Sequence, residues 1–570
     1  MRDWLSYRAR TDPGREALVD TATDNSYTFG TLDTLVDDLA GRLVAAGVES
    51  GDHLGAVLSP RVEYVCLVHA AMRLGATLVP MGAGLTPREL AMQIDAAGVT
   101  TVVCEAATES AVTDAIARQQ PDDTRDGDAT AFDWGPTTET EGETPDTDPT
   151  PAETQTRTVV TVDDPEADEV ESLSAASVDP VPSVTWSLSD TQLILFTSGT
   201  TGDPKPVRLT TGNLLASAGA SAFRLGFDPG DRWLVTLPLH HAGGLSPILR
   251  MPVYGMTVVL REGFDAGATA DDLDRYDATA VSLVPTMLRR MLARRGTLAE
   301  SLRIVLLGGA PAPTDLIDRC RNYSVPVHPT YGMTETASQI ATARPEAAFE
   351  DPGTVGSPLF LTDVTVVDED GEPVPRGEPG ELVVDGPTVT PGYYADDAAT
   401  DAAFGAFGLH TGDVGIVEES GTVTVLNRLD DRIVTGGETV DPGEIADVLA
   451  AHSAVRDVAV VGVADPGWGQ RVAAVVVPES GVATPTSGSD AETERRVDRE
   501  ELLDFARERL AAHKLPKTVT FASSLPRTVS GTIDRDAVRE QFFDGAAGDI
   551  DRADEEDETA DADEADTADA

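Results

Sequence analysis

The sequence predicts an α/β protein with a large N-terminal domain of parallel sheets, a small antiparallel β unit and a smaller, mobile α+β C-terminal domain. Three observations support this fold class. Apolar strand-like runs alternate with amphipathic helix-like segments through the N-terminal part, which is typical of parallel sheets. Residues 360–426 instead carry short alternating strands with frequent Gly and Pro. Residues 430–541 then carry strands and a helix of their own.

The N-terminal elements follow from the spacing of apolar residues. An amphipathic helix is expected over residues 31–48, where a Gly comes at the end. The runs HLGAVLS (53–59) and TVVC (101–104) are expected to be buried strands, with a helix over 63–76 between them. The apolar runs 278–285 and 302–311 both end in Gly or Pro. Ligands bind at the carboxyl ends of strands in such sheets, so we expect the site there.

The later part of the chain predicts a second domain. The runs VRDVAVVGVAD (455–465) and RVAAVVVP (471–478) are expected to be strands, and residues 499–513 a helix. The segment NRLDDRIVTGG (427–437) is interpreted as the junction. The prediction is a large domain over 1–427, a small one over 428–541 and an acidic tail over 542–570.

The charge of the chain excludes several partners. The 570 residues contain 98 Asp and Glu against 42 Lys and Arg, a formal net charge of −56. Such a surface repels nucleic acid and anionic membranes. It also repels itself unless molar salt shortens the Debye length to about 3 Å. The composition therefore predicts the salt-loaded cytoplasm of a halophile.

Cysteine usage and hydropathy point to the same compartment. The three cysteines are far apart and form no CxxC motif, which favours reduced thiols. No run approaches the roughly 18 apolar residues of a membrane span, and the N-terminus lacks a signal-peptide core. We expect a cytoplasmic protein without membrane insertion, whose oligomeric state stays open.

Three stretches of low complexity interrupt the pattern. Residues 121–180 contain 18 acids and 2 bases, and residues 478–498 are similar. Residues 544–570 contain 13 acids and a single base. Their few large apolar residues cannot offset the entropy of ordering. We interpret the first two as surface insertions and the last as a solvated tail.

The run FTSGTTGDPKPVRLT (196–210) carries the strongest chemical signal. It follows a buried strand, and its glycines and hydroxyls make a concavity that suits an anion. Lys205, one of only three lysines in the chain, adds a cation that can follow a phosphate. The alternative is a simple turn with Lys205 on the surface, which the scarcity of lysine disfavours. The usual P-loop spacing cannot be fitted to this run.

This run resembles the phosphate loop of the AMP-forming adenylate enzymes, except that Pro206 replaces the usual Gly. Further motifs of that family follow in order: LLGGAP (306–311), YGMTE (331–335), TGDVG (411–415) and the junction motif. The resemblance covers about residues 15–540. It implies an ATP site formed by Thr197, Ser198, Gly199, Thr200, Thr201, Gly202, Lys205, Gly309, Ala310, Pro311, Tyr331, Gly332, Met333, Thr334, Asp413 and Arg428.

The resemblance also implies roles for these residues. Tyr331 would flank adenine, Asp413 and Arg428 would hold the ribose, and Glu335 would hold Mg²⁺. The implied reaction has two half-reactions: a carboxylate attacks ATP to give an acyl-AMP, and coenzyme A then displaces AMP. The family also implies Asp430 as the hinge and Gly436, Gly437 and Glu438 as the lining of the pantetheine path. The expected catalytic residues are Lys205, Thr334, Glu335 and Arg535.

The sequence of the expected acyl-binding region indicates which class of acid is the substrate. Residues 237–260 and the run TYGMTETASQI (330–340) resemble the o-succinylbenzoate–CoA ligases of menaquinone synthesis. Their substrate is a dicarboxylate, and His241, Ser338 and Gln339 are candidates for holding its second carboxylate. His241 as a packed gate residue is the alternative. Ligases for another aryl or fatty acid are the competing enzymes, and a peptide-synthetase adenylation unit is less favoured because no carrier domain follows.

One departure from the family concerns the usual S-G-K motif. The run LPRTVSGTIDR (525–535) has Thr532 where family members carry a lysine that bridges the acyl carboxylate and the α-phosphate. A hydroxyl carries no charge. We predict that Arg535, or otherwise Lys517, covers the missing charge. A non-catalytic nucleotide-binding relative is the alternative.

Overall fold

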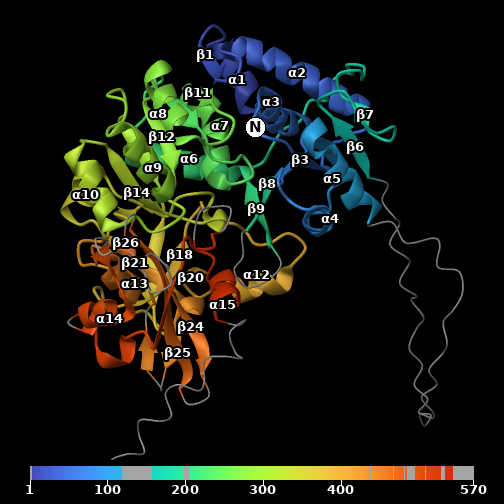
Figure 1. The fold of residues 1–570 in the computed structure, drawn as a ribbon. Coiled ribbons are helices and arrows are strands. Elements are labelled where there is room, and N and C mark those ends of the chain that lie inside the picture. Colours follow the sequence, from blue (N-terminus) through green and yellow to red (C-terminus); the bar gives the residue numbers. More distant parts are fainter. Residues whose placement is uncertain are drawn as a thin grey trace, which may run out of the picture.

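The computed structural model describes residues 3–118, 157–197, 204–435, 438–440, 442–465, 468–479, 482–483, 495–507, 509–527 and 533–543. Figure 1 shows a large N-terminal part above a smaller C-terminal part. Parallel sheets with covering helices form most of the large part, as the sequence predicts.

The first sheet has seven strands in the order β7-β6-β5-β3-β4-β8-β9. All neighbours are parallel except β8 and β9. Helices α3, α4 and α5 connect its central strands, and α4 begins at a capping box between Thr86 and Glu89. The elements are α2 (Phe29–Ala45), β3 (His53–Val57), α3 (Val62–Leu74), β4 (Thr77–Pro80), α4 (Pro87–Ala96), β5 (Thr101–Cys104), α5 (Ala106–Ala117), β6 (Thr158–Thr161), β7 (Glu171–Ser172), β8 (Thr191–Phe196) and β9 (Pro206–Thr210).

The second sheet has nine strands in the order β16-β15-β14-β13-β12-β10-β11-β1-β2. Its central strands are parallel and fully buried, which explains their continuous apolar runs. The strands are β1 (Glu16–Asp20), β2 (Asn25–Thr28), β10 (Arg232–Val235), β11 (Thr257–Leu260), β12 (Ala280–Leu283), β13 (Ile304–Leu307), β14 (Val327–Tyr331), β15 (Ala341–Thr342) and β16 (Ser357–Pro358). The helices are α1 (Trp4–Thr11), α6 (Thr211–Leu225), α7 (Ala242–Tyr254), α8 (Ala266–Arg275), α9 (Pro285–Arg295), α10 (Thr314–Asn322), η1 (Thr334–Thr336) and α11 (Pro345–Glu350).

A five-stranded sheet follows, and its main ladders are antiparallel, which confirms the prediction for residues 360–426. Its long strand β20 carries the TGDVG motif between β18 and β21. The elements are β17 (Asp363–Val367), β18 (Gly380–Asp385), α12 (Asp397–Ala403), β19 (Phe404–Gly405), β20 (Gly408–Val417) and β21 (Val423–Arg428).

The C-terminal part has its own five-stranded sheet with an apolar cluster on each side. Separate cores are expected of a unit that moves as a body, and the predicted boundaries at 428 and 541 remain a proposal. The elements are η2 (Leu429–Asp431), β22 (Ile433–Thr435), β23 (Glu438–Val440), α13 (Pro442–Ala450), β24 (Val455–Asp465), β25 (Gly469–Pro478), β26 (Val482–Ala483), β27 (Arg495–Arg496), α14 (Arg499–Arg507), η3 (Ala512–Lys514), β28 (Thr518–Phe521) and α15 (Arg535–Phe542).

The structure differs from the predicted insertion over residues 121–180. Residues 158–161 form β6, which pairs in parallel with β5, and residues 171–172 form β7. The acidic composition of the whole stretch hid the short apolar run TVVT. Residues 119–156, and the acidic tail from 544 onward, lie outside the described residues.

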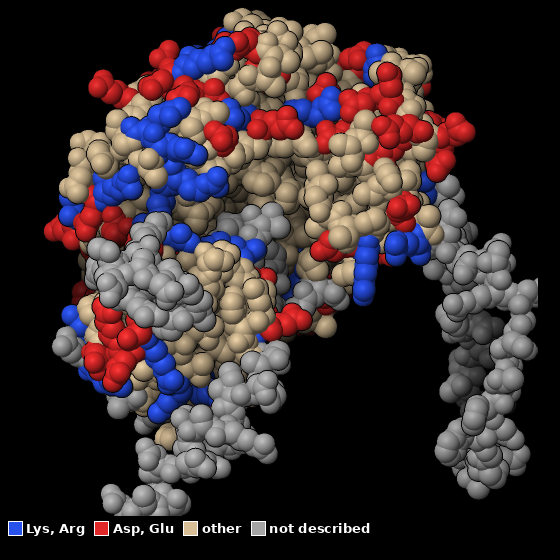
Figure 2. Space-filling view, viewed as in Figure 1, with Lys and Arg blue, Asp and Glu red and all other residues tan. Residues whose placement is uncertain are grey.

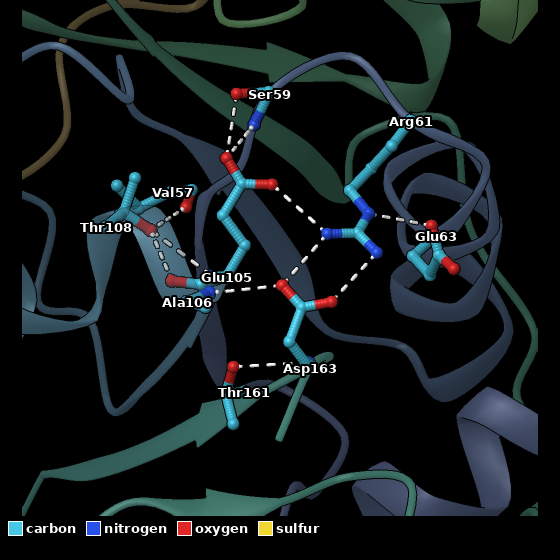
Figure 3. A network of polar contacts seen from close by, with 9 residues as sticks. All are labelled: Val57, Ser59, Arg61, Glu63, Glu105, Ala106, Thr108, Thr161 and Asp163. Carbon is cyan, nitrogen blue, oxygen red and sulfur yellow. Dashed lines mark hydrogen bonds and ion pairs between the residues drawn. The ribbon is translucent and has the colours of Figure 1, made fainter. Parts of the chain in front are cut away.

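Arg61 connects the loops that follow three parallel strands of the first sheet, β3, β5 and β6 (Figure 3). Its guanidinium bonds both carboxylate oxygens of Asp163, at 3.0 Å each, and lies 3.3 Å from Glu105 and 2.8 Å from Glu63. Glu105 in turn accepts hydrogen bonds from the backbone and side chain of Ser59. The network therefore joins the chain before and after residues 119–156.

Acidic and basic side chains are interspersed over the face drawn in Figure 2, and this face is hollowed between the large and small parts. Within the described part of the chain, no helix is long and apolar enough to cross a membrane.

Candidate active site

The predicted phosphate loop is closed by the two strands on either side of it. Phe196 on β8 pairs with Pro206 on β9. The Thr197 N–H donates to the Lys205 carbonyl at 3.2 Å, and the Lys205 N–H donates to Oγ1 of Thr197 at 3.2 Å. The predicted residues between these two points, Ser198, Gly199, Thr200, Thr201 and Gly202, lie outside the described residues.

The predicted adenine residues meet at the carboxyl ends of two neighbouring strands. β13 and β14 are parallel, with Leu307 opposite Pro329, so the turn at Gly309, Ala310 and Pro311 lies beside Tyr331. Gly309 has φ +79°, a left-handed conformation that glycine adopts without strain.

The loop after Tyr331 is folded tightly against itself. A Cβ on Gly332 would lie 1.7 Å from the Ser338 carbonyl oxygen, so only glycine fits there. Ser338 itself has φ +120°, a region that non-glycine residues rarely adopt. Strained residues of this kind concentrate at functional sites. The loop carries Met333, Thr334 and Glu335 between these two residues, with Thr334 at the start of η1.

Glu335 is a buried carboxylate without an ion-pair partner among the described residues. Its Oε1 accepts a hydrogen bond from the Tyr393 hydroxyl at 3.1 Å. Burial raises the pKa of Glu335, and the nearby charges of Arg428 and Lys205 oppose that shift. A buried carboxylate with one hydrogen-bonded oxygen fits a hard cation such as Mg²⁺, for which phosphate oxygens would supply further ligands.

The predicted ribose residues form a second polar group. Arg428 and Asp413 are opposite each other on β21 and β20, and their side chains lie 3.2 Å apart. The Tyr331 hydroxyl donates to the same carboxylate at 2.7 Å. Burial raises the pKa of Asp413, an effect that Arg428 and Tyr331 counteract. The structure thus brings Tyr331, predicted for adenine, into contact with the residues predicted for the ribose.

The predicted acyl residues lie around α7. His241 is the N-cap of this helix, and its Nε2 is buried with no hydrogen-bond partner among the described residues. The rings of His240 and His241 lie 4.2 Å apart, and burial lowers the pKa of His240 to about 3. The Gln339 amide donates to Oγ1 of Thr342 at 2.8 Å.

Sequence reasoning missed Arg250, which is buried behind this region. Its guanidinium donates to Ser221 at 3.1 Å, Ser217 at 3.0 Å and Oε1 of Gln339 at 3.4 Å. Among the described residues no carboxylate pairs with it, and burial lowers its pKa. A signal was present, because Arg250 is the one charged residue in the run 242–260.

The C-terminal part holds the remaining predicted residues. Gly436 and Gly437 lie outside the described residues, and Glu438 begins β23. Asp430 lies in η2, next to Asp431, whose carboxylate is 2.7 Å from Nη1 of Arg535. Arg535 thus contacts the segment predicted as the hinge, while Thr532 lies outside the described residues.

An exposed surface of Trp468 with Lys517 lies beside the end of β22. Thr435 on β22 pairs with Gly469 on β25, which places Trp468 next to Thr435. Trp468 is 53% exposed, and Nζ of Lys517 lies 5.5 Å from the centroid of its ring. This surface, Trp468 with Lys517, was not predicted.

Comparison with known proteins defines the class. The model of the AMP-binding enzyme family matches residues 5–394, and that of the AMP-binding enzyme C-terminal domain matches residues 444–532. The chain belongs to the family of AMP-binding enzymes.

Within that family, the chain is similar to 2-succinylbenzoate–CoA ligases. It is 35% identical to that of Bacillus velezensis over 539 residues, 94% of this chain and 97% of the relative. It is 33% identical to that of Bacillus subtilis over 549 residues, 96% and 99% of the two chains.

Solved structures give the same result. The o-succinylbenzoate coenzyme A synthetase of Bacillus subtilis is 31% identical to this chain. Its complex with the acyl-adenylate intermediate OSB-AMP superposes with a TM-score of 0.78, covering 95% of this chain and 98% of that one. Its complex with ATP and magnesium ion gives a TM-score of 0.79, with 95% and 99% covered.

Proposed function

We propose that this protein is a 2-succinylbenzoate–CoA ligase that uses ATP, Mg²⁺ and coenzyme A and acts in menaquinone biosynthesis. The similarity to such ligases over nearly the whole chain supports the reaction. The proposal that the acid is 2-succinylbenzoate rests on Arg250, a buried cation that has no carboxylate partner among the described residues.

Arg250 is suited to the carboxylate that does not react. A buried guanidinium is costly unless it is paired, and the dipoles of Ser217, Ser221 and Gln339 offset only part of that cost. A substrate carboxylate would complete the pairing with charge-assisted hydrogen bonds. We propose that His241, at the start of the same helix, and Ser338, beside Gln339, lie toward the reacting end of the acid.

The first half-reaction takes place between the phosphate loop and Glu335. The substrate carboxylate attacks the α-phosphorus of ATP and the bond to pyrophosphate breaks, which leaves the acyl-AMP. Thr197 and Lys205 hold the triphosphate while Asp413 and Arg428 hold the ribose. Glu335 would hold Mg²⁺, which when bound neutralises charge on the phosphoryl oxygens. Fixed charges of this kind stabilise the transition state without reorganisation.

The second half-reaction uses the C-terminal part, which would rotate about Asp430. The thiol of coenzyme A loses its proton, attacks the acyl carbon and displaces AMP. Pantetheine would pass Gly436, Gly437 and Glu438. The exposed Trp468 and Lys517 beside Thr435 suit the adenine and phosphates of coenzyme A, because an indole face stacks on a base and an ammonium pairs with phosphate.

A substrate comparison tests the proposal. Pyrophosphate release in high salt is measured with 2-succinylbenzoate, benzoate and octanoate. We expect 2-succinylbenzoate to exceed the others in kcat/KM by at least about a hundredfold, because a buried polar site rejects acids that leave it unpaired. Arg250→Met should abolish this preference. Arg224→Met is the matched control, because Arg224 bonds the carbonyls of Ser357 and Pro358 instead.

Two outcomes would contradict the proposal. A preference for octanoate or benzoate in the wild-type protein would assign the chain to another acid. If Arg250→Met keeps the preference for 2-succinylbenzoate, the second carboxylate does not bind at Arg250.

We also propose a cytoplasmic location in a halophile. The net charge of −56 supports high internal salt. The three cysteines are free and buried, and burial raises the pKa of Cys66, Cys104 and Cys320 to about 12, which suits inert reduced thiols.

A further inference from the structure

Tyr393 contacts two charged residues of the proposed adenylation site, Glu335 and Lys205. Its hydroxyl donates to Oε1 of Glu335 at 3.1 Å, and Nζ of Lys205 lies 5.1 Å from the centroid of its ring. The side chain is buried, with 7% of its surface exposed. One phenol therefore links the carboxylate proposed for the metal and the lysine proposed for the triphosphate.

The backbone around Tyr393 is fixed to the strand that leaves the phosphate loop. Tyr393 forms an antiparallel bridge with Val207. On either side of it, the Tyr394 N–H donates to the Pro206 carbonyl at 2.8 Å and the Arg208 N–H donates to the Gly392 carbonyl at 3.1 Å. The position of the ring relative to Lys205 is thus set by β9 itself.

The same segment also fixes the backbone of Glu335. The Thr390 N–H donates to the Glu335 carbonyl at 2.7 Å, and the Thr390 hydroxyl donates to the Arg208 carbonyl at 2.5 Å. Residues 390–394 therefore bind β9 on one side and η1 on the other.

Lys205 and Glu335 form no ion pair with each other, although both belong to the described residues. Lys205 is exposed and Glu335 is buried, and their opposite charges attract and would neutralise each other if they met. The phenol occupies the contact that each of them would otherwise make. A cation within about 6 Å of a ring is held by the ring's quadrupole, so the lysine is retained without being neutralised.

We propose that Tyr393 is a positioning residue for adenylation: its ring keeps Lys205 and Glu335 apart, and its hydroxyl orients the Glu335 carboxylate. The inference rests on the proposed function, because it concerns the same ATP and metal site. It adds a residue to that site which the motifs do not name.

Nucleotide binding tests the inference without turnover. Calorimetry measures the binding of an ATP analogue with a methylene bridge between the α- and β-phosphorus, with and without Mg²⁺. In Tyr393→Phe we expect metal-free affinity within about twofold of wild type, while half-saturation needs about tenfold more Mg²⁺, as for one lost hydrogen bond. In Tyr393→Leu the metal-free affinity should also fall about tenfold, because Lys205 then pairs with Glu335.

A rescue variant and a neighbouring tyrosine complete the experiment. Glu335→Gln added to Tyr393→Leu should restore metal-free affinity, because Lys205 has lost the partner that neutralised it. Tyr394→Phe is the control, since the Tyr394 ring packs edge-on against His53. It should bind as wild type does, and a tenfold effect in it would overturn the assignment to Tyr393.

Two results would refute the proposal. An unchanged Mg²⁺ requirement in Tyr393→Phe would remove the role of the hydroxyl, and a failed rescue by Glu335→Gln would remove the role of the ring. Neither depends on the acid. If the variants show the expected changes in binding but the wild-type protein forms no acyl-AMP from 2-succinylbenzoate, the proposed function would be overturned and this inference would stand.

Discussion

The Tyr331 hydroxyl donates a hydrogen bond of 2.7 Å to the carboxylate of Asp413. Tyr331 ends a strand of the nine-stranded sheet, and Asp413 lies on β20 of the small antiparallel sheet. This bond joins two separately built sheets at the nucleotide site. It ties the residue proposed for adenine to the residue proposed for ribose.

The first prediction concerns this pair. Asp413→Ala removes both the ribose acceptor and the partner of Arg428, so kcat/KM for ATP should fall about a hundredfold, as for hydrogen bonds to a charged group. Tyr331→Phe should cost about tenfold. Pyrophosphate release against ATP concentration measures both. Asp385→Asn, an exposed change on neighbouring β18, should have no effect. A wild-type KM for ATP in Asp413→Ala would contradict the ribose assignment.

The second prediction concerns the charges that face the phosphates. Lys205→Ala and Glu335→Ala should each slow adenylation by two or more orders of magnitude, since one preorganised charge contact is worth roughly 3–4 kcal/mol. Both variants should keep the wild-type melting temperature. Arg88→Ala, which removes an exposed cation, serves as the control. Wild-type pyrophosphate release from either variant would remove that residue from the site.

The third prediction concerns Thr532. Single-turnover formation of acyl-AMP is compared in the wild type, Thr532→Lys, Arg535→Ala and Lys517→Ala. If Arg535 covers the missing charge, it must leave Asp431, and Arg535→Ala should lose adenylation. Lys517→Ala should lose thioester formation if the lysine serves coenzyme A, and adenylation if it replaces the missing cation.

The control for this series is the wild-type protein itself. Full adenylation in both alanine variants would show that neither cation substitutes. If Thr532→Lys forms acyl-AMP and the wild-type protein does not, the wild-type protein is a non-catalytic relative.

The fourth prediction concerns pH and the buried His69. Burial lowers its pKa to about 4, and neither ring nitrogen has a hydrogen-bond partner in the described part of the chain. Between about pH 6.5 and pH 4 the unfolded chain binds a proton on His69 that the folded chain does not. The free energy of unfolding should therefore decrease as the pH is lowered from about 6.5 to about 4, by on the order of 3 kcal/mol.

Urea denaturation at several pH values measures this effect. His69→Met removes the titrating group at similar volume, so its stability should fall less steeply than that of the wild type. If the free energy of unfolding of the two proteins depends on pH in the same way, His69 does not contribute to the pH dependence.

The fifth prediction concerns salt. With a net charge of −56 the folded chain repels itself in dilute buffer, and molar salt screens that repulsion. The melting temperature should rise steeply between low and molar KCl. A protein that is as stable in dilute buffer as in molar KCl would not be halophilic.

Local patterns were sufficient for much of the fold. The buried strands, the helices between them and the small antiparallel sheet follow from the spacing of apolar residues and from Gly and Pro. The apolar run TVVT of β6 was missed because composition averaged over 121–180 conceals four residues. Short strands in polar surroundings become recognisable only when their partner, here β5, is known.

The site was predictable where motifs are contiguous. The ends of the phosphate loop and the YGMTE and TGDVG motifs carry their chemistry in adjacent residues. Arg250 and Tyr393 were missed because their roles depend on partners far along the chain: Ser217 and Gln339 for Arg250, and Glu335 for Tyr393. Burial of a charge is a tertiary property that a local pattern does not encode.

The Arg61 network has a practical consequence for engineering. Because it joins the loops after β3, β5 and β6, the strands on both sides of residues 119–156 are anchored to each other by contacts among described residues. The cost of closing a longer loop rises by only about 0.6 kcal/mol for each doubling of its length. A reporter domain whose termini lie close together can therefore be spliced between residues 118 and 157, far along the sheet from β9, to follow this enzyme in living cells.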